Sequence, residues 1–524
     1  MVELDATFFG SIFLSFVIGA SMLYIFEHMR SRGPCGDIPG SYGFLWVGEA
    51  IDFYRDPVEF SKKRFLKHGK IFRSMIFGQP IIFVRGARAV ALYSSGTAQG
   101  LGACQEAYLF DHIQYTAHST RRRPALMSES DHQHSFKHLA ILSAITMVHN
   151  QPYLIDKVGA AMTSRFTVAA SVGENINGAD LCRDVFLHVA VAVFLREVEN
   201  KDRLKVLLTE WLTMNSAMPF PFCHMTAWNK GLAAMSELDH LITVDIRRRQ
   251  QPGQMQGEDI LGCMLKAAEK RTDAPSSKEF QDIVERTVLT DWWSFIRSVC
   301  LTTASACTWL LVCFEQTPAI KQALITEVRN FRRNIDFHAL QEASTLPYLD
   351  ATAEEALRVY GFLSHPNLCR VALLDIEFEG HVIPKGTPVY LPLHSLNFEE
   401  EYFPNARIFD PLRFMEGGVN KKTGGSYTFG VGHHACPGGV FARALVKLFA
   451  FSLLNNFDFS AESHAQEPVH PRASMMVFGQ NKKSGAAVSD SHYFPVPSGG
   501  LKYSVFTARK QISTNEVIVG PTPW

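Results

Sequence analysis

An eleven-residue stretch near the end of the chain, FGVGHHACPGG (Phe429–Gly439), constrains the fold more than any other part of the sequence. Four of its residues are glycines, which allow the backbone N–H groups to approach a neighbouring side chain closely. Pro437 follows Cys436, and apolar residues then recur at helical spacing, so a helix is predicted to start at the proline. Cys436 then lies at a helix N-terminus, whose partial positive charge favours a thiolate.

Four kinds of site contain a cysteine in such a loop. A buried structural cysteine needs neither the preceding glycines nor a proline-initiated helix. A nucleophilic cysteine needs a base, for which His434 is a candidate, and a zinc site needs three or four ligands, for which His433, His434 and Cys436 are too closely spaced. The fourth kind is an axial thiolate ligand to haem iron, which uses the thiolate that this loop favours.

The stretch FGVGHHACPGGVFA resembles the haem-binding loop of the cytochrome P450 family, F-x-x-G-x-x-x-C-x-G. Phe429, Gly432, Cys436 and Gly438 are in register with that pattern, and Ala442 stands at a further family position. The resemblance implies a mainly α fold with minor β structure, and haem b whose iron is bound by the Cys436 thiolate. It also implies a microsomal monooxygenase that takes electrons from an NADPH-dependent cytochrome P450 reductase, since the chain has no glycine-rich nucleotide-binding motif.

Two further motifs resemble the family in the expected order. Glu355 and Arg358 match its E-x-x-R pair, and their three-residue spacing puts both on one helix face. Taken alone, such a pair is usually an exposed ion pair worth less than about 1 kcal/mol. Arg413, in FDPLRF, occupies the place of the arginine that completes a Glu-Arg-Arg network in the family. The resemblance implies that this network is structural and fixes the cysteine loop.

Four residues at three family positions are candidates to bind the haem propionates. Arg370, in SHPNLCR, matches an arginine that in many relatives binds a propionate by charge-assisted hydrogen bonds; the alternative is an ordinary surface arginine at a strand start. His434 stands where the family usually has arginine or histidine, and His134 and His138 are the nearest match to its W-x-x-x-R motif. Histidine is largely neutral near pH 7, so Arg370 is expected to carry more of the charge compensation.

The resemblance fails at one chemical position of the distal helix. The apolar segment Thr290–Pro318 falls where the family places a helix over the haem, with the text A/G-G-x-D/E-T-T. In SVCLTT, Thr302 and Thr303 match the two threonines, but Leu301 replaces the acid that relays protons with the first threonine. A leucine cannot carry a proton.

Leu301 leaves several interpretations of the chemistry open. Thr302 or Thr303 with ordered water relays the protons of a monooxygenase, or the substrate contributes a hydroxyl. Alternatively, the enzyme does not use O₂ and isomerises or dehydrates its substrate, as some relatives do. Both threonines also have an ordinary structural alternative, a hydrogen bond back to a helix carbonyl. A non-catalytic membrane haem protein is the remaining alternative.

The composition favours a large folded protein over a disordered or nucleic-acid-binding one. The 524 residues include 39 phenylalanines and are 47% hydrophobic but only 19% charged, which predicts a large phenylalanine-rich core. Lysine plus arginine equal aspartate plus glutamate at 51 each, so no overall field attracts nucleic acid. The 10 cysteines are scattered without close pairs, which indicates core residues in a reducing compartment.

Hydrophobic periodicity predicts where helices and strands lie. Helical spacing dominates residues 135–345. Residues 80–94 have the pattern of a short strand followed by a helix. Residues 371–393 alternate and break at Gly380 and at Pro384–Gly386, as a small sheet with turns would.

The N-terminus predicts a membrane anchor. Residues 6–26 carry no charge, and this length spans a hydrocarbon core of about 30 Å. Acidic residues precede the stretch and arginines follow it, which places the rest of the chain in the cytosol; a cleaved signal peptide or a buried core helix is the alternative. We therefore expect a single transmembrane helix in the endoplasmic reticulum membrane, with an anchor at 1–29, a Pro/Gly hinge at 30–43 and a catalytic domain at 44–524.

The substrate and the partner surface are only weakly indicated. Residues 38–72 resemble the start of cytochromes P450 that act on terpenoids, sterols and retinoids. Trp292 and Trp293 on the distal helix favour an apolar pocket, so a lipophilic small molecule, such as a terpenoid or other secondary metabolite, is expected. Arg443 and Lys447, opposite the apolar face of the helix after Cys436, are candidates to dock the reductase if they are exposed.

Overall fold

The computed structural model describes part of the chain, namely residues 19, 35–43, 48–55, 57–76, 79–103, 152–174, 176–196, 198–216, 225–251, 259–269, 285, 288–289, 292–293, 295–331, 345–360, 369–415, 426–432, 435–436, 438–461 and 502–508.

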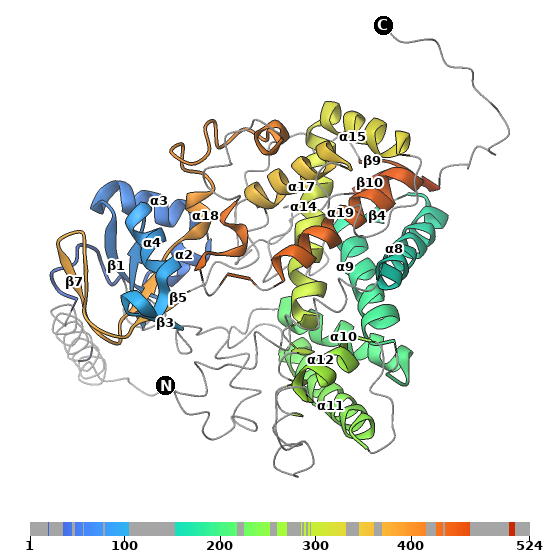
Figure 1. Ribbon diagram of the computed structural model, residues 1–524, viewed down its shortest axis with the longest axis horizontal. Coiled ribbons are helices and arrows are strands. Elements are labelled where there is room, and N and C mark those ends of the chain that lie inside the picture. The colour runs from blue at the N-terminus through green and yellow to red at the C-terminus, as the bar shows by residue number, and fades with distance from the viewer. Residues whose placement is uncertain are drawn as a thin grey trace, which may run out of the picture.

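A five-stranded sheet forms the strand-rich part of the molecule, on the left in Figure 1. Its strand order is β1-β2-β8-β5-β3, and its neighbours pair antiparallel except β2 and β8, which are parallel. Two of these strands come from a segment about 300 residues later in the chain than β1 and β2, so the sheet joins distant parts of the sequence. The strands are β1 (Ile71–Ile76), β2 (Gln79–Val84), β3 (Leu101–Ala103), β5 (Cys369–Ala372) and β8 (Pro388–Tyr390).

Short helices and a small hairpin accompany this sheet. The helices are α2 (Ala50–Arg55), α3 (Pro57–His68), α4 (Ala87–Ser95) and α18 (Leu393–Leu396), and the hairpin pairs β6 (Ile376–Phe378) with β7 (His381–Ile383). The predicted strand and helix within residues 80–94 are confirmed by β2 and α4. The predicted small strands within residues 371–393 are confirmed by β5 to β8. Phenylalanine side chains from the sheet contribute to the hydrophobic core. The rings of Phe72 on β1 and Phe83 on β2 are stacked with their centroids 4.6 Å apart.

Helices make up most of the rest of the described chain, as predicted. They are α8 (Pro152–Val172), α9 (Gly178–Val189), α10 (Lys201–Ser216), α11 (Met225–Arg249), α12 (Ile260–Glu269), α14 (Ala304–Gln316), α15 (Pro318–Asn330), α17 (Pro347–Tyr360) and α19 (Gly439–Asn456). A three-stranded sheet of β4 (Ile176–Asn177), β10 (Lys502–Ala508) and β9 (Phe457–Ala461) packs beside α8. Helix α14 lies centrally and contacts α9, α17 and α19 (Figure 1).

One helix among the described residues is long and apolar enough to cross a membrane. It spans Phe295–Gln316, and 78% of its most apolar window is buried inside the protein. Burial of this extent identifies it as a core helix. The predicted anchor, residues 6–26, lies outside the described residues apart from Gly19, which is helical.

The described part of the predicted hinge, residues 35–43, lies against strand β1. The Arg73 N–H donates to the Pro39 carbonyl at 2.8 Å, and the Arg73 guanidinium donates to the carbonyls of Cys35 and Gly36 at 2.9 Å. Gly40 has φ 141°, and a Cβ there would lie 2.1 Å from the Arg73 carbonyl oxygen. This segment is therefore held by backbone contacts that require glycine.

Candidate active site

The loop that carries Cys436 is folded tightly on itself. The Cys436 N–H donates to the Phe429 carbonyl at 2.6 Å, and Gly430 and Gly432 have φ of 82° and 67°. A Cβ at Gly432 would lie 2.3 Å from the carbonyl oxygen of Ser94, the C-terminal residues of α4 being packed against the loop. Gly432 is thus required both by its backbone conformation and by this approach.

The thiol of Cys436 is accessible, whereas the six other cysteines that the structure describes as free are buried. Helix α19 begins at Gly439, two residues later than predicted, with Gly438 as the residue before it. Desolvation by surrounding protein raises the pKa of the Cys436 thiol above its ordinary value, while the Gly438 N–H and the charge of Arg443 lower it. Desolvation outweighs these two contacts, so the loop by itself favours the thiol. A coordinated metal ion deprotonates such a thiol.

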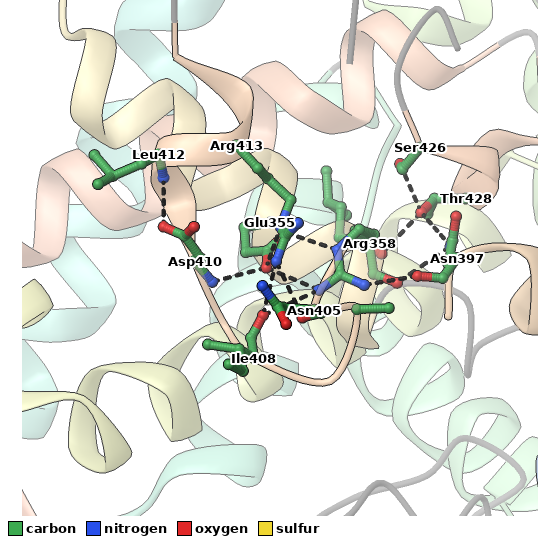
Figure 2. A network of polar contacts seen from close by, with 12 residues as sticks. Glu355, Arg358, Asn397, Asn405, Ile408, Asp410, Leu412, Arg413, Ser426 and Thr428 are labelled. Carbon is green, nitrogen blue, oxygen red and sulfur yellow. Dashed lines mark hydrogen bonds and ion pairs between the residues drawn. The ribbon is translucent and has the colours of Figure 1, made fainter. Parts of the chain in front are cut away.

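Glu355, Arg358 and Arg413 form one buried network (Figure 2). Glu355 accepts two hydrogen bonds from Arg358, at 2.7 and 2.8 Å, and one from Arg413 Nε at 3.0 Å. The Asp410 N–H adds a further bond to the same carboxylate at 2.8 Å. Glu355 and Arg358 are fully buried, so this is a desolvated cluster and not an exposed ion pair.

Two residues that the sequence did not single out connect this network to the cysteine loop. Asn397 donates to the Arg358 carbonyl at 3.1 Å and accepts from the Tyr427 N–H at 2.9 Å. Thr428 donates to the Leu357 carbonyl at 2.8 Å. Figure 2 shows Asn397 and Thr428 side by side at one end of the network. A lone asparagine and a lone threonine carry no spacing signal that would have identified them.

The distal segment Ser298–Thr303 is π-helical and continues directly into α14. From residue 295 to 314, the side chains that are not buried are Ser298, Thr302 and Ala306, four residues apart, together with Arg297. The Thr302 and Thr303 hydroxyls both donate to the Ser298 carbonyl, at 2.7 and 3.1 Å. Both threonines therefore bond back to the helix, while Thr302 also lies on its accessible line.

Leu301 is buried and does not lie on this accessible line. Residues 295–314 contain no aspartate or glutamate, and the next acid, Glu315, is paired with Lys321 at 2.7 Å. No carboxylate of the described helix therefore takes over the position that Leu301 occupies.

Arg370 lies on β5 and is buried, with 7% of its surface exposed. The alternative of an ordinary surface arginine is therefore wrong. Its guanidinium carbon is 5.7 Å from the ring centroid of Tyr93, whose hydroxyl donates to the Val389 carbonyl at 2.6 Å. His434 and His138 lie outside the described residues.

Lys447 and Arg443 do not form the free basic face considered above. Lys447 is buried and forms an ion pair with Asp350, and burial lowers its pKa to about 8. Arg443 donates to Glu354 at 2.5 Å. The helix α17, which carries both acids, packs against α19, so both basic side chains are paired with acids of that helix.

The model of the family described as "Cytochrome P450" matches residues 38–485. The chain belongs to the cytochrome P450 family. Members of the family are monooxygenases, and their cofactor is a haem whose iron is bound by a cysteine thiolate. The predicted enzyme class and cofactor are therefore confirmed.

Known proteins resemble this cytochrome P450 along most of its length. Abscisic acid 8'-hydroxylase 2 of Arabidopsis thaliana is 25% identical over 441 residues, covering 80% of this chain and 83% of the relative. Abscisic acid 8'-hydroxylase CYP707A1 of Solanum lycopersicum is 23% identical over 88% of this chain and 89% of its own length. The solved structure of retinoic acid-bound cyanobacterial CYP120A1 matches with a TM-score of 0.66 and 23% identity, covering 90% of this chain and 99% of its own. This likeness shows a common fold.

The described residues fit a haem in this cytochrome P450. Cys436 is an accessible thiol that is nevertheless desolvated by protein, and its loop leaves no room for a Cβ at Gly432. Cys436 would bind the haem iron through its thiolate, and the buried Arg370 would neutralise an anionic group of the cofactor. When bound, the haem supplies the oxidative chemistry of the family.

Gly432→Ala is expected to lower the haem content of the purified protein. A side chain at positive φ costs about 1–2 kcal/mol, and this one would also push the cysteine loop away from Ser94. Gly386→Ala is the matched control, because Gly386 has φ 83° but nothing within 4 Å of the added Cβ. The ratio of haem to protein should fall for Gly432→Ala only; equal losses in both variants would show that backbone strain alone decides the effect.

Proposed function

We propose that this cytochrome P450 is a membrane-anchored monooxygenase that oxidises a lipophilic small molecule, a terpenoid or related secondary metabolite. It takes electrons from NADPH-cytochrome P450 reductase and is held in the endoplasmic reticulum membrane with the catalytic domain in the cytosol. The observation that carries the proposal is the accessible line of Ser298, Thr302 and Ala306 on an otherwise buried, apolar helix. Small side chains there leave room for a substrate, and hydroxyls provide the polar groups.

The substrate class is supported by the names of its relatives. Two of them are abscisic acid 8'-hydroxylases, and the solved structure that shares its fold was determined with retinoic acid. Abscisic acid and retinoic acid are both apolar acids built from isoprene units. A molecule of this kind is the proposed substrate class.

We assign roles to the site residues from the positions they share with the motifs of the cytochrome P450 family. Cys436 binds the iron, and Phe429, Gly432 and Gly438 shape its loop. Arg370, with His434 and His138, compensates the propionate charges. Thr302, with Thr303 beside it, holds and passes protons, exchanging its bond to the Ser298 carbonyl for one to water or substrate.

A second function, isomerisation or dehydration without O₂, is favoured by the buried Leu301 and the missing carboxylate. The two are separated by supplying the holoprotein with reductase, NADPH, isotopically labelled O₂, and either abscisic acid or retinoic acid as probe. Labelled oxygen in the product is expected. A product that forms without label, and without NADPH, would replace the monooxygenase with the second function.

Two threonine variants refine this experiment. Thr302→Val is expected to lower severalfold the fraction of NADPH that ends in product, because the accessible hydroxyl is lost. Thr308→Val is the matched control: Thr308 donates to the Ala304 carbonyl at 2.9 Å in the same way but is buried. A Thr302→Val enzyme as well coupled as the control would remove Thr302 from the proton path.

A further inference from the structure

Arg443 joins the helix α17 to the cysteine loop. Its Nε donates to the Glu354 carboxylate at 2.5 Å, and its guanidinium carbon lies 4.4 Å from the ring centroid of Phe429. The Phe429 carbonyl accepts the hydrogen bond from the Cys436 N–H. Arg443 therefore contacts both Glu354 and Phe429, and the carbonyl of Phe429 binds the backbone N–H of Cys436.

The charges of this pair are only partly screened by water. The Arg443 side chain is 29% exposed and that of Glu354 15%, so their fields act through protein more than through solvent. The guanidinium also lies close to the backbone beside the cysteine: a Cβ at Gly439 would be 3.4 Å from Arg443 Nη1, and the Gly439 N–H donates to the Cys436 carbonyl at 3.2 Å. Together the two groups are nearly neutral, but either one alone would leave a net charge beside the iron ligand.

We propose that Arg443 and Glu354 are a positioning pair that holds Phe429 in place and sets the reduction potential of the iron bound by Cys436. Reduction adds one electron, and with it one negative charge, to the haem and its thiolate. A nearby positive charge favours that step and a nearby negative charge opposes it. The proposal rests on the haem ligation of the family and not on the proposed substrate, so failure of the substrate assignment leaves it unaffected.

The test is a spectroelectrochemical titration of the purified holoprotein and five variants. Arg443→Gln leaves the Glu354 carboxylate alone and should lower the reduction potential. Glu354→Gln leaves the guanidinium alone and should raise it. The double variant should return close to the unsubstituted protein. Arg203→Gln, which breaks the exposed Arg203–Glu237 pair between α10 and α11, should leave the potential unchanged.

Opposite shifts distinguish a charge effect from a merely structural one. Shifts of the same sign in both single variants, or none in either, would overturn the proposal. If Arg443→Gln fails to incorporate haem, the sign for Glu354→Gln still decides the question. Arg443→Lys keeps the charge without the planar group over the Phe429 ring, so it should retain the potential while broadening the Soret band of the reduced carbonyl complex.

Discussion

Cys436→Ser is expected to abolish both substrate oxidation and the Soret band position that marks a thiolate-ligated haem in the reduced carbonyl complex. A serine hydroxyl is a far weaker electron donor than a thiolate and stays protonated near pH 7. The substitution changes one atom in an accessible side chain, so the fold should persist. A reduced-minus-oxidised difference spectrum under carbon monoxide, recorded with a turnover assay, measures both effects.

Cys263→Ala provides the control for this experiment. Cys263 is fully buried in the core, so its loss should lower stability by about 1 kcal/mol while leaving the spectrum intact. A thiolate-type spectrum that survives Cys436→Ser would show that another residue binds the iron and would end the assignment of this loop.

Glu355→Gln is expected to lower the free energy of unfolding by about 3–5 kcal/mol, because it leaves two buried guanidinium groups without their counter-ion. Glutamine has nearly the same shape, so loss of charge and not loss of packing is tested. The Arg358 and Arg413 side chains are exposed by no more than 5%, and water cannot replace the carboxylate. The shift in the denaturant midpoint, followed by circular dichroism and by haem absorbance, measures the effect.

Glu237→Gln is the comparison for that result. It removes the same kind of carboxylate–arginine pair, with Arg203, at a site where both side chains are about half-exposed. Its midpoint should stay close to that of the unsubstituted protein. If Glu355→Gln shifts the midpoint as little as this control, the network does not hold the cysteine loop. If the network does hold the loop, Glu355→Gln should release its haem at a lower denaturant concentration than the one at which the whole protein unfolds.

Spacing within a short segment explains what the sequence could predict. Glu355 and Arg358 are three residues apart on one helix, and the glycines around Cys436 stand within a few residues of it. Such patterns can be recognised in the sequence because the local backbone fixes the geometry. The Glu355–Arg358 pair and the glycine-rich loop around Cys436 were therefore predictable without the tertiary structure.

Contacts between distant segments were not predictable. Asn397 and Thr428 connect the network to the loop only because the chain returns to α17 after 39 and 71 residues. Lys447 was placed on the polar side of α19, which is correct for the isolated helix, but the fold brings Asp350 of α17 against that side. The π-helical turn at Ser298–Thr303 could not be predicted either, because no residue type in SVCLTT distinguishes a π-helix from an α-helix.

The approach of Gly432 to Ser94 has a consequence for how the protein matures. The two residues are separated by more than 300 positions, and the Arg358–Asn397 contacts must close as well before the loop has its shape. Contacts of such large sequence separation form late in folding, because the entropy of closing the intervening chain must be lost first. The iron-binding loop therefore cannot be completed on a nascent chain until α4, α17 and α19 have all been synthesised and docked. Haem binding should therefore begin only when the fold is complete. A ribosome-bound intermediate that lacks α19 should take up no haem.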